Sequence, residues 1–367
     1  MWETLLNATR LNGIPSSMDA VDVRLPQYWY VACLADDLGR RRPVARTVLG
    51  VRVALFRDER GRAVAVLDRC PHRNAPLSIG KVCDGQLQCA YHGWRFDGTG
   101  ACRFVPGLVG EGADRRARRV DTFPTVEQDG FVWVWPAGGD APAGRPFRFP
   151  GVDEAGYTTV RRSLSVTASL HASLENTLDV PHTAFLHGGL FRGGRPPVDI
   201  EVVVRHTPDG VEAEYVGEPR PPGVAGRILA PEGGVVTHVD RFLMPSIAQV
   251  EYRLGENHLV TTTAFTPGEA GVTDLHAAVT FRLRLPPRLV KAVVTPIANR
   301  IFAQDKAILR EQADNIGRFG GEQFASTELD VLGQHILRLL RRAERGESDA
   351  DGSNSAHPPD RRFTMRV

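Results

Sequence analysis

Two closely spaced pairs of sulfur and imidazole side chains are the residues in this sequence best suited to chemistry. Cys70 and His72 are separated by one residue, and Cys89 and His92, separated by two, follow after a gap of sixteen. Two cysteines and two histidines can hold a [2Fe-2S] cluster in which one iron takes both thiolates and the other takes both imidazoles. The same residue types also form zinc sites, but the interleaved order and the hairpin-rich strands around it favour the cluster.

A second group of candidate metal ligands lies further along the chain. Asp179, His182 and His187 follow one another at short spacing. Non-haem Fe(II) that activates dioxygen usually takes two histidines and one carboxylate on one face. Asp179 lies one turn from His182 and is one candidate for the carboxylate. Two later acids, Asp305 and Glu311, are the alternatives.

Both groups resemble motifs of one enzyme family. Residues 70–102, CPHRNAPLSIGKVCDGQLQCAYHGWRFDGTGAC, resemble the Rieske motif of the ring-hydroxylating oxygenase α subunits, and residues 176–187, with the spacing Asn-x2-Asp-x2-His-x4-His, resemble their mononuclear iron motif. The resemblance is to the Rieske non-haem iron oxygenases, and the length of the chain favours their short homotrimeric branch of monooxygenases and O-demethylases.

The resemblance assigns a role to each candidate residue. It implies that Asp305, in preference to Glu311, is the third iron ligand beside His182 and His187. Asn176 would lie near the iron, with helix capping or solvent exposure as the equally weighted alternative.

Asp179 takes a different role under the same resemblance. It would hydrogen-bond His182 and, across a subunit boundary, His92 of a neighbouring chain. The cluster of one protomer would then pass electrons to the iron of the next. Such a route requires an oligomer, and the resemblance implies a head-to-tail homotrimer.

The implied function is oxidation of a small organic substrate with O2 and two electrons, by hydroxylation, demethylation or a related monooxygenation. The implied cofactors are one [2Fe-2S] Rieske cluster and one mononuclear Fe(II) per chain. Electrons would come ultimately from NAD(P)H through a ferredoxin, a ferredoxin reductase or both. The alternatives are an aromatic-ring dihydroxylating dioxygenase and, from another class, a Rieske electron-transfer protein without an active mononuclear iron.

Composition excludes several other classes. A net charge of +2 and a pI near 8.3 do not favour a nucleic-acid partner. The sequence has no apolar run long enough for a transmembrane helix and no pattern of a signal peptide, so a cytoplasmic location is expected. Five cysteines are an odd number, and Cys33, Cys83 and Cys102 are expected to be small core residues.

The predicted fold class is α+β, with an N-terminal all-β Rieske domain followed by a catalytic domain that resembles the helix-grip (START-like) fold and contains a large antiparallel sheet. The expected segments are an extension at 1–27, the Rieske domain at 28–136, a Pro- and Gly-rich linker at 137–150, the mononuclear iron domain at 151–345 and a disordered tail at 346–367.

Strand and helix patterns agree with this division. Strands are expected in the first domain at 28–33, 47–56, 63–68, 122–128 and 131–135, and in the second at 157–164, 200–205, 211–215, 235–243, 248–254, 258–266 and 275–285. Helices are expected at 169–186, kinked or broken at Pro181, at 288–318, interrupted near Pro296, and at 326–345, capped by Ser326 or Thr327.

Four further predictions concern the surroundings of the two sites. The glycine- and arginine-rich segment 188–197 is expected to be a mobile loop that could close over the iron, and a basic run in the Rieske half could dock an acidic ferredoxin. No histidine outside the two motifs, at positions 171, 206, 238, 258, 276, 335 and 357, is expected to have a chemical role. The basic run comprises Arg115, Arg116, Arg118 and Arg119, and the expected apolar pocket residues are Phe185, Leu190, Phe191, Leu243, Met244, Tyr252, Phe265 and Phe281.

Overall fold

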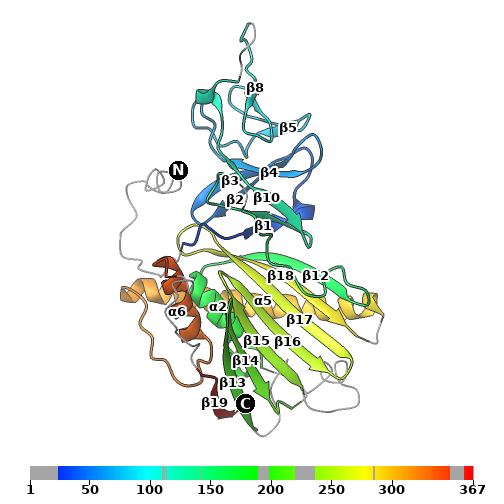
Figure 1. The fold of residues 1–367 in the computed structure, drawn as a ribbon, viewed down its shortest axis with the longest axis vertical. Helices are drawn as coiled ribbons and strands as arrows, with labels where there is room; N and C mark the ends of the chain where they lie inside the picture. Colours follow the sequence, from blue (N-terminus) through cyan, green and yellow to red (C-terminus); the bar gives the residue numbers. More distant parts are fainter. Residues whose placement is uncertain are drawn as a thin grey trace. The chain divides into compact units, whose positions relative to one another are not determined.

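The chain folds into two compact units. The computed structural model describes residues 24–109, 112, 114–140, 142–188, 198–219, 236–283, 286–347 and 359–366 (Figure 1). Within these residues the first unit comprises Leu25–Arg148 and Thr266–Ala270, and the second comprises Phe149–Phe265 and Gly271–Val367.

The first unit is built from three small antiparallel sheets. Their strand orders are β1-β11-β10, β2-β3-β4-β9 and β5-β6-β7-β8. Their bounds are Tyr30–Leu34 (β1), Val44–Val48 (β2), Val51–Arg57 (β3), Ala63–Leu67 (β4), Lys81–Cys83 (β5), Gln86–Gln88 (β6), Arg95–Phe96 (β7), Cys102–Phe104 (β8), Thr122–Phe123 (β9), Thr125–Gln128 (β10) and Phe131–Val134 (β11), with short 3-10 turns at Ala35–Asp37 (η1) and Arg116–Arg118 (η2). The predicted all-β first domain is confirmed.

Two tight hairpin turns illustrate how local sequence determines the pairing in this unit. Asp129 and Gly130 both have positive φ, 56° and 81°, and join β10 to β11 as their sequence predicts. Leu49 and Gly50 also have positive φ, 50° and 79°, and divide the single strand predicted at 47–56 into β2 and β3. A leucine rarely adopts this conformation, so the pattern contained no clear signal for the second turn.

The second unit contains the predicted large antiparallel sheet, which has eight strands in the described residues. Its strand order is β12-β18-β17-β16-β15-β14-β13-β19. The bounds are Thr158–Val166 (β12), Asp199–Thr207 (β13), Gly210–Val216 (β14), Thr237–Leu243 (β15), Ile247–Leu254 (β16), Asn257–Pro267 (β17), Thr273–Arg282 (β18) and Arg361–Arg366 (β19), and the helices are Leu170–Leu178 (α2), His182–Phe185 (α3), Pro287–Phe319 (α5) and Gly333–Glu344 (α6).

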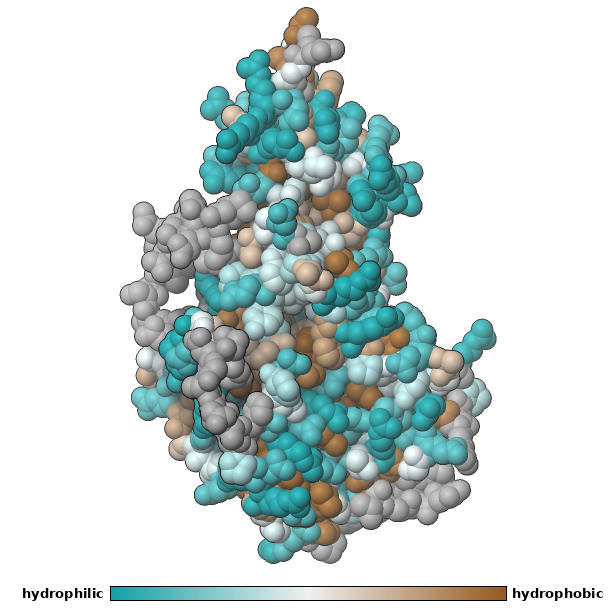
Figure 2. Space-filling view, viewed as in Figure 1, coloured by the Kyte–Doolittle hydropathy of each residue, from teal (hydrophilic) through white to brown (hydrophobic). Residues whose placement is uncertain are grey.

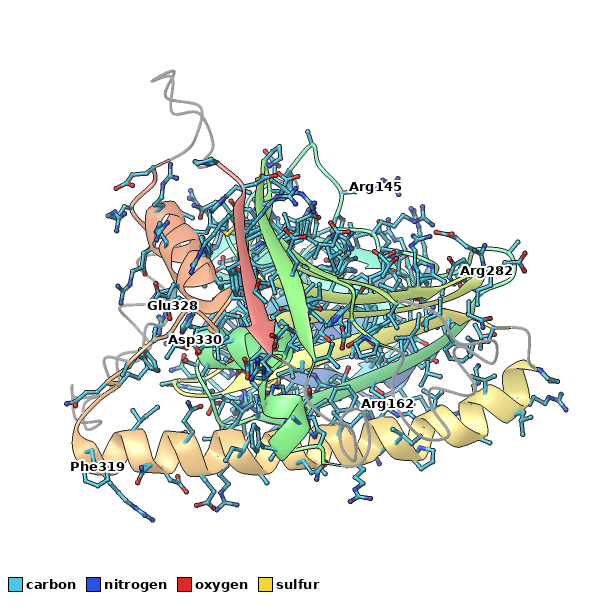
Figure 3. All side chains as sticks on the ribbon, turned by 90° about the horizontal axis from the view of Figure 1, so that it is seen from below. Arg145, Arg162, Arg282, Phe319, Glu328 and Asp330 are labelled. Carbon is cyan, nitrogen blue, oxygen red and sulfur yellow. The ribbon has the colours of Figure 1, made fainter. Side chains whose placement is uncertain are left out.

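The long helix α5 lies along the sheet and supplies much of its cover (Figure 3). Val290 and Val294 of this helix pack against a cluster that includes Val279 and Phe281 of β18. The predicted interruption near Pro296 is wrong, because α5 continues through it to Phe319. Proline removes one backbone hydrogen bond, but its fixed φ near −65° is compatible with a helix, and the packing on the sheet supports the turns on both sides.

The last helix begins later than predicted. Its first residue is Gly333, although the pattern favoured a start at Ser326 or Thr327. In the preceding segment the backbone N–H of Thr327 donates to the Asp330 carboxylate, and the N–H of Leu329 donates to the Thr327 hydroxyl. Such local side-chain bonds compete with the helical backbone pattern, so this stretch forms turns instead.

The predicted disorder of the 346–367 tail is wrong for Arg361–Arg366, which form the edge strand β19. This strand pairs with β13, and Met365 is only 2% exposed. Arg366 forms an ion pair with Asp199 at 2.6 Å across the two strands. The polar composition of the tail concealed the alternation that places Met365 on the buried face. Residues 348–358 lie outside the described residues.

The face of the protein seen in Figure 2 is largely hydrophilic, with hydrophobic residues scattered in small groups. This distribution is ordinary for side chains that face water. In the part of the chain that the structure describes, no helix combines the length and the apolar character needed to cross a membrane.

Candidate metal centres

The two Rieske-like segments fold into a matched pair of loops. Cys70 follows β4 and Cys89 follows β6, and each cysteine N–H donates to the carbonyl five residues later, that of Ala75 or Trp94. In each loop the residue four positions after the cysteine donates back to the cysteine carbonyl; these residues are Asn74 and Gly93. Both have positive φ, 60° and 71°, which allows the tight return of the chain.

These loops bring the four predicted cluster ligands together in two pairs. The Cys70 and Cys89 thiols are buried and hydrogen-bonded, and burial, together with the neighbouring thiol, raises the pKa of Cys70 to about 11. The rings of His72 and His92 have centroids 4.4 Å apart. Within the described residues, His72 Nδ1 is buried and has no hydrogen-bond partner. Paired thiols beside paired imidazoles, with one ring nitrogen unsatisfied, fit a Rieske cluster.

An aromatic stack connects one of these histidines to the basic run. Trp94 lies parallel to His72, with centroids 4.7 Å apart and 6° between the planes. The Arg118 guanidinium lies 5.8 Å from the Trp94 ring centroid. His92 is exposed, and its neighbour Tyr91 is 66% exposed. One ligand ring is therefore covered by the stack, and the other faces outward.

The second candidate centre depends on a break between two helices. Helix α2 is capped at Ser169, whose hydroxyl accepts from the Ala172 N–H, and it ends at Leu178. Pro181 then precedes α3, which begins at His182, so the predicted break at this proline is confirmed. Asp179 lies in the break, and its carboxylate accepts from the His182 N–H at 3.0 Å.

Asp179 and Gln304 determine which nitrogen of each histidine faces the site. The Asp179 backbone carbonyl accepts from His182 Nδ1, and Gln304 Oε1 accepts from His187 Nδ1 at 3.0 Å. An acceptor at Nδ1 favours the tautomer with its proton there, and Nε2 is then available to bind a metal. The two Nε2 atoms lie 3.3 Å apart.

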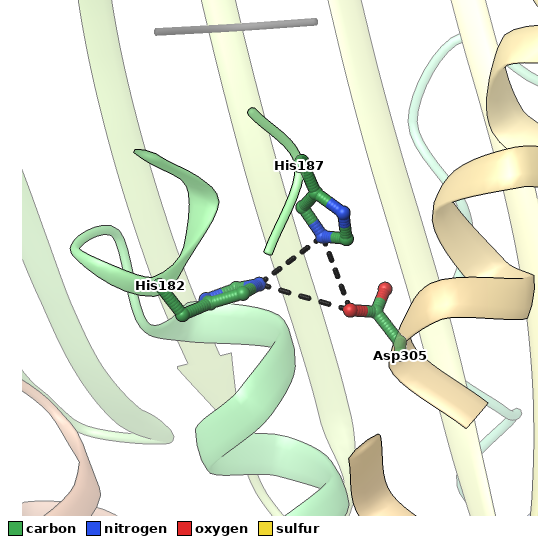
Figure 4. A group of neighbouring side chains, drawn as sticks. All are labelled: His182, His187 and Asp305. Atoms are coloured by element: carbon green, nitrogen blue, oxygen red, sulfur yellow. Dashed lines mark hydrogen bonds and ion pairs between the residues drawn. The ribbon is translucent and has the colours of Figure 1, made fainter. Parts of the chain in front are cut away.

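Asp305 on α5 completes this cluster (Figure 4). Its Oδ1 lies 3.1 Å from His187 Nε2 and 3.7 Å from His182 Nε2. That oxygen is buried and has no hydrogen bond in the described part of the protein. Burial raises the pKa of Asp305, although His187 and His182 oppose the increase. An unsatisfied carboxylate oxygen facing two imidazole nitrogens fits an Fe(II) site of two histidines and one carboxylate.

Of the other residues predicted for this site, Asn176 contacts the cluster and Glu311 does not. Asn176 hydrogen-bonds the Asp305 side chain. Glu311, the rival ligand, is exposed and is not part of the cluster. Although burial disfavours the charged ring, Asp179 and Asp305 raise the pKa of His182.

An apolar cavity of about 280 Å³ adjoins the three ligands. About half of its lining side chains are aliphatic, and nearly all of these come from the sheet, the residue after β18 and α5. Of the six predicted pocket residues that the structure describes, only Tyr252 lines it, and Phe185 is 89% exposed. Phe265 and Phe281 share the strand alternation of lining residues such as Thr263 and Val279 but do not line the cavity themselves, and Phe281 packs with Val290 of α5. Residues 189–197, which include Leu190, Phe191 and most of the predicted lid, lie outside the described residues.

One histidine without a predicted role proves to be part of the cavity wall. His238 is buried between the carboxylates of Glu218 and Asp240, and all three side chains line the cavity. His238 and Asp240 are two positions apart on β15 and therefore share a face, which is the only signal that the sequence contained. Gln304, directly before Asp305, was also missed.

Comparison with known proteins agrees with this arrangement. Residues 28–124 match the Rieske [2Fe-2S] domain, and residues 166–346 match the vanillate O-demethylase oxygenase C-terminal domain. The chain belongs to the Rieske oxygenases, and its second domain is of the vanillate O-demethylase type.

Three relatives show the extent of the similarity. Dicamba O-demethylase, oxygenase component, of Stenotrophomonas maltophilia is 40% identical over 163 residues, which are 43% of this chain and 46% of that protein. The vanillate O-demethylase oxygenase subunit of a Pseudomonas species is 25% identical over 88% of this chain and 95% of that protein. The crystal structure of dicamba monooxygenase bound to dicamba aligns with a TM-score of 0.73 and 26% identity over 89% of this chain and 99% of that one. The curated relatives that are 34 to 40% identical to this chain are matched over less than half of their own length.

Replacement of Asp305 tests the metal assignment. Asp305→Ala is expected to lose nearly all mononuclear iron, because it removes the only anionic group of the three-residue cluster. The visible absorption of the [2Fe-2S] cluster should be unchanged, since its ligands lie in the other unit. Metal analysis combined with absorption spectroscopy measures both quantities, with Glu311→Ala as the matched control on the same helix. If Asp305→Ala retained its mononuclear iron, a different acid would have to be the third ligand.

Proposed function

We propose that this chain is the oxygenase component of a Rieske-type monooxygenase system that oxidises a small organic molecule with O2 and two electrons. The observation that carries the proposal is the cluster of His182, His187 and Asp305 beside an apolar cavity, in a chain that also holds paired Rieske ligands. Iron at the first set supplies dioxygen activation, and the [2Fe-2S] cluster supplies electrons one at a time.

The residues around the three ligands hold them in position. The Asp179 carbonyl fixes the ring of His182, Gln304 fixes that of His187, and Asn176 holds the Asp305 carboxylate. These contacts hold the three ligand atoms within 4.8 Å of one another, as a single metal ion would require. The aliphatic wall keeps bulk water from the reacting carbon and leaves space for one small substrate.

Monooxygenation or demethylation is the preferred reaction within this class. Two relatives are named as O-demethylases, of dicamba and of vanillate, and the second of them aligns over nearly its whole length. Aromatic-ring dihydroxylation is the alternative. A Rieske electron carrier is disfavoured, because electron transfer alone gives no reason to keep a second ligand cluster beside a cavity.

Cofactor content and a single turnover test the proposal together. The purified chain should contain about three irons and two acid-labile sulfides, since a Rieske cluster accounts for two of each. Enzyme that has been reduced and then exposed to O2 should convert a member of a panel of aromatic ethers, amines and polycyclic compounds, with the product identified by mass. Two irons and no product would instead indicate an electron carrier.

Within this proposal the active assembly is a homotrimer in which the cluster of one chain reduces the iron of the next. Two apolar side chains of the Rieske-like segment, Ile79 and Tyr91, are 65% and 66% exposed, and Phe185 of α3 is 89% exposed. Exposed apolar groups of this kind suit surfaces that a neighbouring copy covers. Asp179, which precedes α3, would bridge His182 and the neighbour's exposed cluster histidine.

Asp179→Asn tests this bridge. The amide can still accept from the His182 N–H, so iron content should remain, whereas turnover should fall by about 10–100-fold, as for other outer partners of metal ligands. The measurement is turnover under saturating electron donor, with iron content and sedimentation on the same preparation. Loss of iron would show that Asp179 acts as a ligand, and unchanged turnover would remove the bridge.

The basic run at residues 115–119 is proposed as the docking surface for an acidic ferredoxin. Arg115, Arg116 and Arg119 are exposed, and Arg118 adjoins the stack of Trp94 on His72. Positive charge beside a cluster ligand would steer and orient an anionic donor. NAD(P)H as the ultimate donor and a cytoplasmic location remain predictions from the sequence.

Charge reversal tests the docking surface. Arg116→Glu is expected to slow reduction of the cluster by a ferredoxin about tenfold at low salt and to weaken its dependence on ionic strength. Stopped-flow absorption of the cluster measures the rate, and Arg148→Glu, an exposed arginine of the same unit outside the run, is the control. Equal rates in the two variants would contradict this docking site.

A further inference from the structure

Two threonine side chains of strand β17 form part of the cavity wall. Thr261 and Thr263 both line the cavity, and they share a face of the strand because they are two positions apart. Thr262, which lies between them, faces the other side of the sheet, where its hydroxyl accepts from Gln249 Nε2 at 3.3 Å. The alternation along β17 therefore brings two of its threonines to the cavity and one to the opposite face.

The four threonines that line the described cavity use their hydroxyls in two different ways. Thr177 donates to the carbonyl four residues before it at 3.0 Å, and Thr183 donates to the carbonyl three residues before it at 2.7 Å. Such bonds to a nearby backbone carbonyl satisfy the hydroxyl locally. The hydroxyls of Thr261 and Thr263 form no hydrogen bond with another residue that the structure describes, and neither oxygen is fully enclosed. These two hydroxyls are therefore available to a ligand in the cavity.

The immediate surroundings of the two hydroxyls are apolar. The direct cross-strand partners on β16 are Val250 for Thr261 and Ala248 for Thr263. Leu259 lies two positions before Thr261 on the same face of β17 and also lines the cavity. Thr263 is only 2% exposed. A hydrogen bond is stronger in such a medium of low polarity, and a polar group without a partner is costly there.

Thr261 is separate from the acidic cluster in the same wall. Val250 of β16 lies between Asp240 of β15 and Thr261 in the register of the sheet. Two strand spacings, or roughly 9.5 Å, therefore separate the backbones of Asp240 and Thr261. The two threonines can contact a ligand at a different point from the carboxylates.

The chemistry of the hydroxyl indicates what it would bind. The carboxylates of the described lining, at positions 179, 218, 240 and 305, offer hydrogen-bond acceptors, whereas a threonine hydroxyl also offers a donor. A ligand oxygen that carries no proton can only accept, so the donors of Thr261 and Thr263 suit it. Positions two residues apart on a strand are about 6.7 Å apart, so the two hydroxyls would contact different points of one ligand and fix its orientation.

We propose that Thr261 and Thr263 form a hydrogen-bonding edge that orients the substrate through oxygen acceptors of the carbonyl or aryl ether type. The apolar body of the ligand would lie against the aliphatic side chains of the sheet and α5, with its reacting carbon toward His182, His187 and Asp305. This assignment rests on the proposed function in taking the cavity as the substrate site.

Matched probes with and without an oxygen acceptor test the assignment by binding alone. One pair is 4-methoxyacetophenone and 4-isopropylanisole, in which a ketone oxygen is replaced by a methyl group on the same ring. The second pair carries the same two groups on a methoxynaphthalene ring. Because the isopropyl group leaves water more readily than the ketone, the informative quantity is the ratio of the two Kd values within a pair, compared between variants. Equilibrium dialysis with the iron-loaded holoenzyme measures each Kd.

The double variant Thr261→Val and Thr263→Val removes both hydroxyls with little change of shape. The Kd of the ketone is expected to rise about tenfold while that of the isopropyl probe does not rise, so the ratio shifts about tenfold. The corresponding double variant to serine keeps both hydroxyls and should retain most of the preference. Thr262→Val is the matched control on the same strand, because its side chain faces away from the cavity. The thermal midpoint and the [2Fe-2S] spectrum verify that each variant is folded.

Several results would overturn the assignment. These are a ketone affinity that is unchanged in the double valine variant, an equal shift in Thr262→Val, a loss in the serine variant as large as that in the valine variant, and binding of none of the four probes to the unmodified protein.

Binding and turnover separate this inference from the proposed function. If the ratio shifted in the valine variant but no substrate were oxidised, the result would support the hydrogen-bonding edge and count against the oxygenase proposal. Oxidation of substrates together with an unchanged ratio would do the reverse.

Discussion

The candidate iron site depends on the hydrogen bonds that Asp179 makes at the end of α2. Its carboxylate accepts from the His182 N–H and its carbonyl accepts from the same residue's ring. Without Pro181 the helix would continue, and the Asp179 carbonyl would be directed to a backbone N–H further along it. The break instead leaves this carbonyl for the imidazole, so a local backbone constraint sets the orientation of a ligand. His187 receives the corresponding support from Gln304 on α5, a helix more than one hundred residues away in sequence.

Short-range features of both sites could be predicted, because spacing within a loop or a turn limits where side chains can lie. The paired loops around Cys70 and Cys89 and the break at Pro181 are of this kind. The sheet was predictable for a similar reason, since alternating strands with short connections favour antiparallel neighbours. Asp305 could be chosen over Glu311 only through family resemblance, because the fold decides which acid on α5 faces the histidines.

Features that depend on distant partners could not be predicted. His238 has no metal-like neighbour at short spacing, and its role in the wall follows from Glu218 beyond β14 and from tyrosines on two adjacent strands. Arg361–Arg366 have a polar composition typical of a tail, and pairing with β13 gives them their structure. At Pro296 a local signal for a break was outweighed by packing on the sheet. In each case a tertiary interaction outweighed the local pattern.

The cavity combines two polar groups with a wall that is otherwise mainly uncharged, and this contrast has a consequence for specificity. An aliphatic surface discriminates weakly between molecules of similar size, since one methylene is worth only about 1–3 kcal/mol. A buried charged cluster discriminates far more strongly, because a wrong partner leaves it uncompensated in a medium of low polarity. The first polar group, His182, His187 and Asp305, is the candidate metal cluster. The second polar group, Glu218, His238 and Asp240, lies in the wall of the same cavity, so a ligand that fills the cavity would meet both groups.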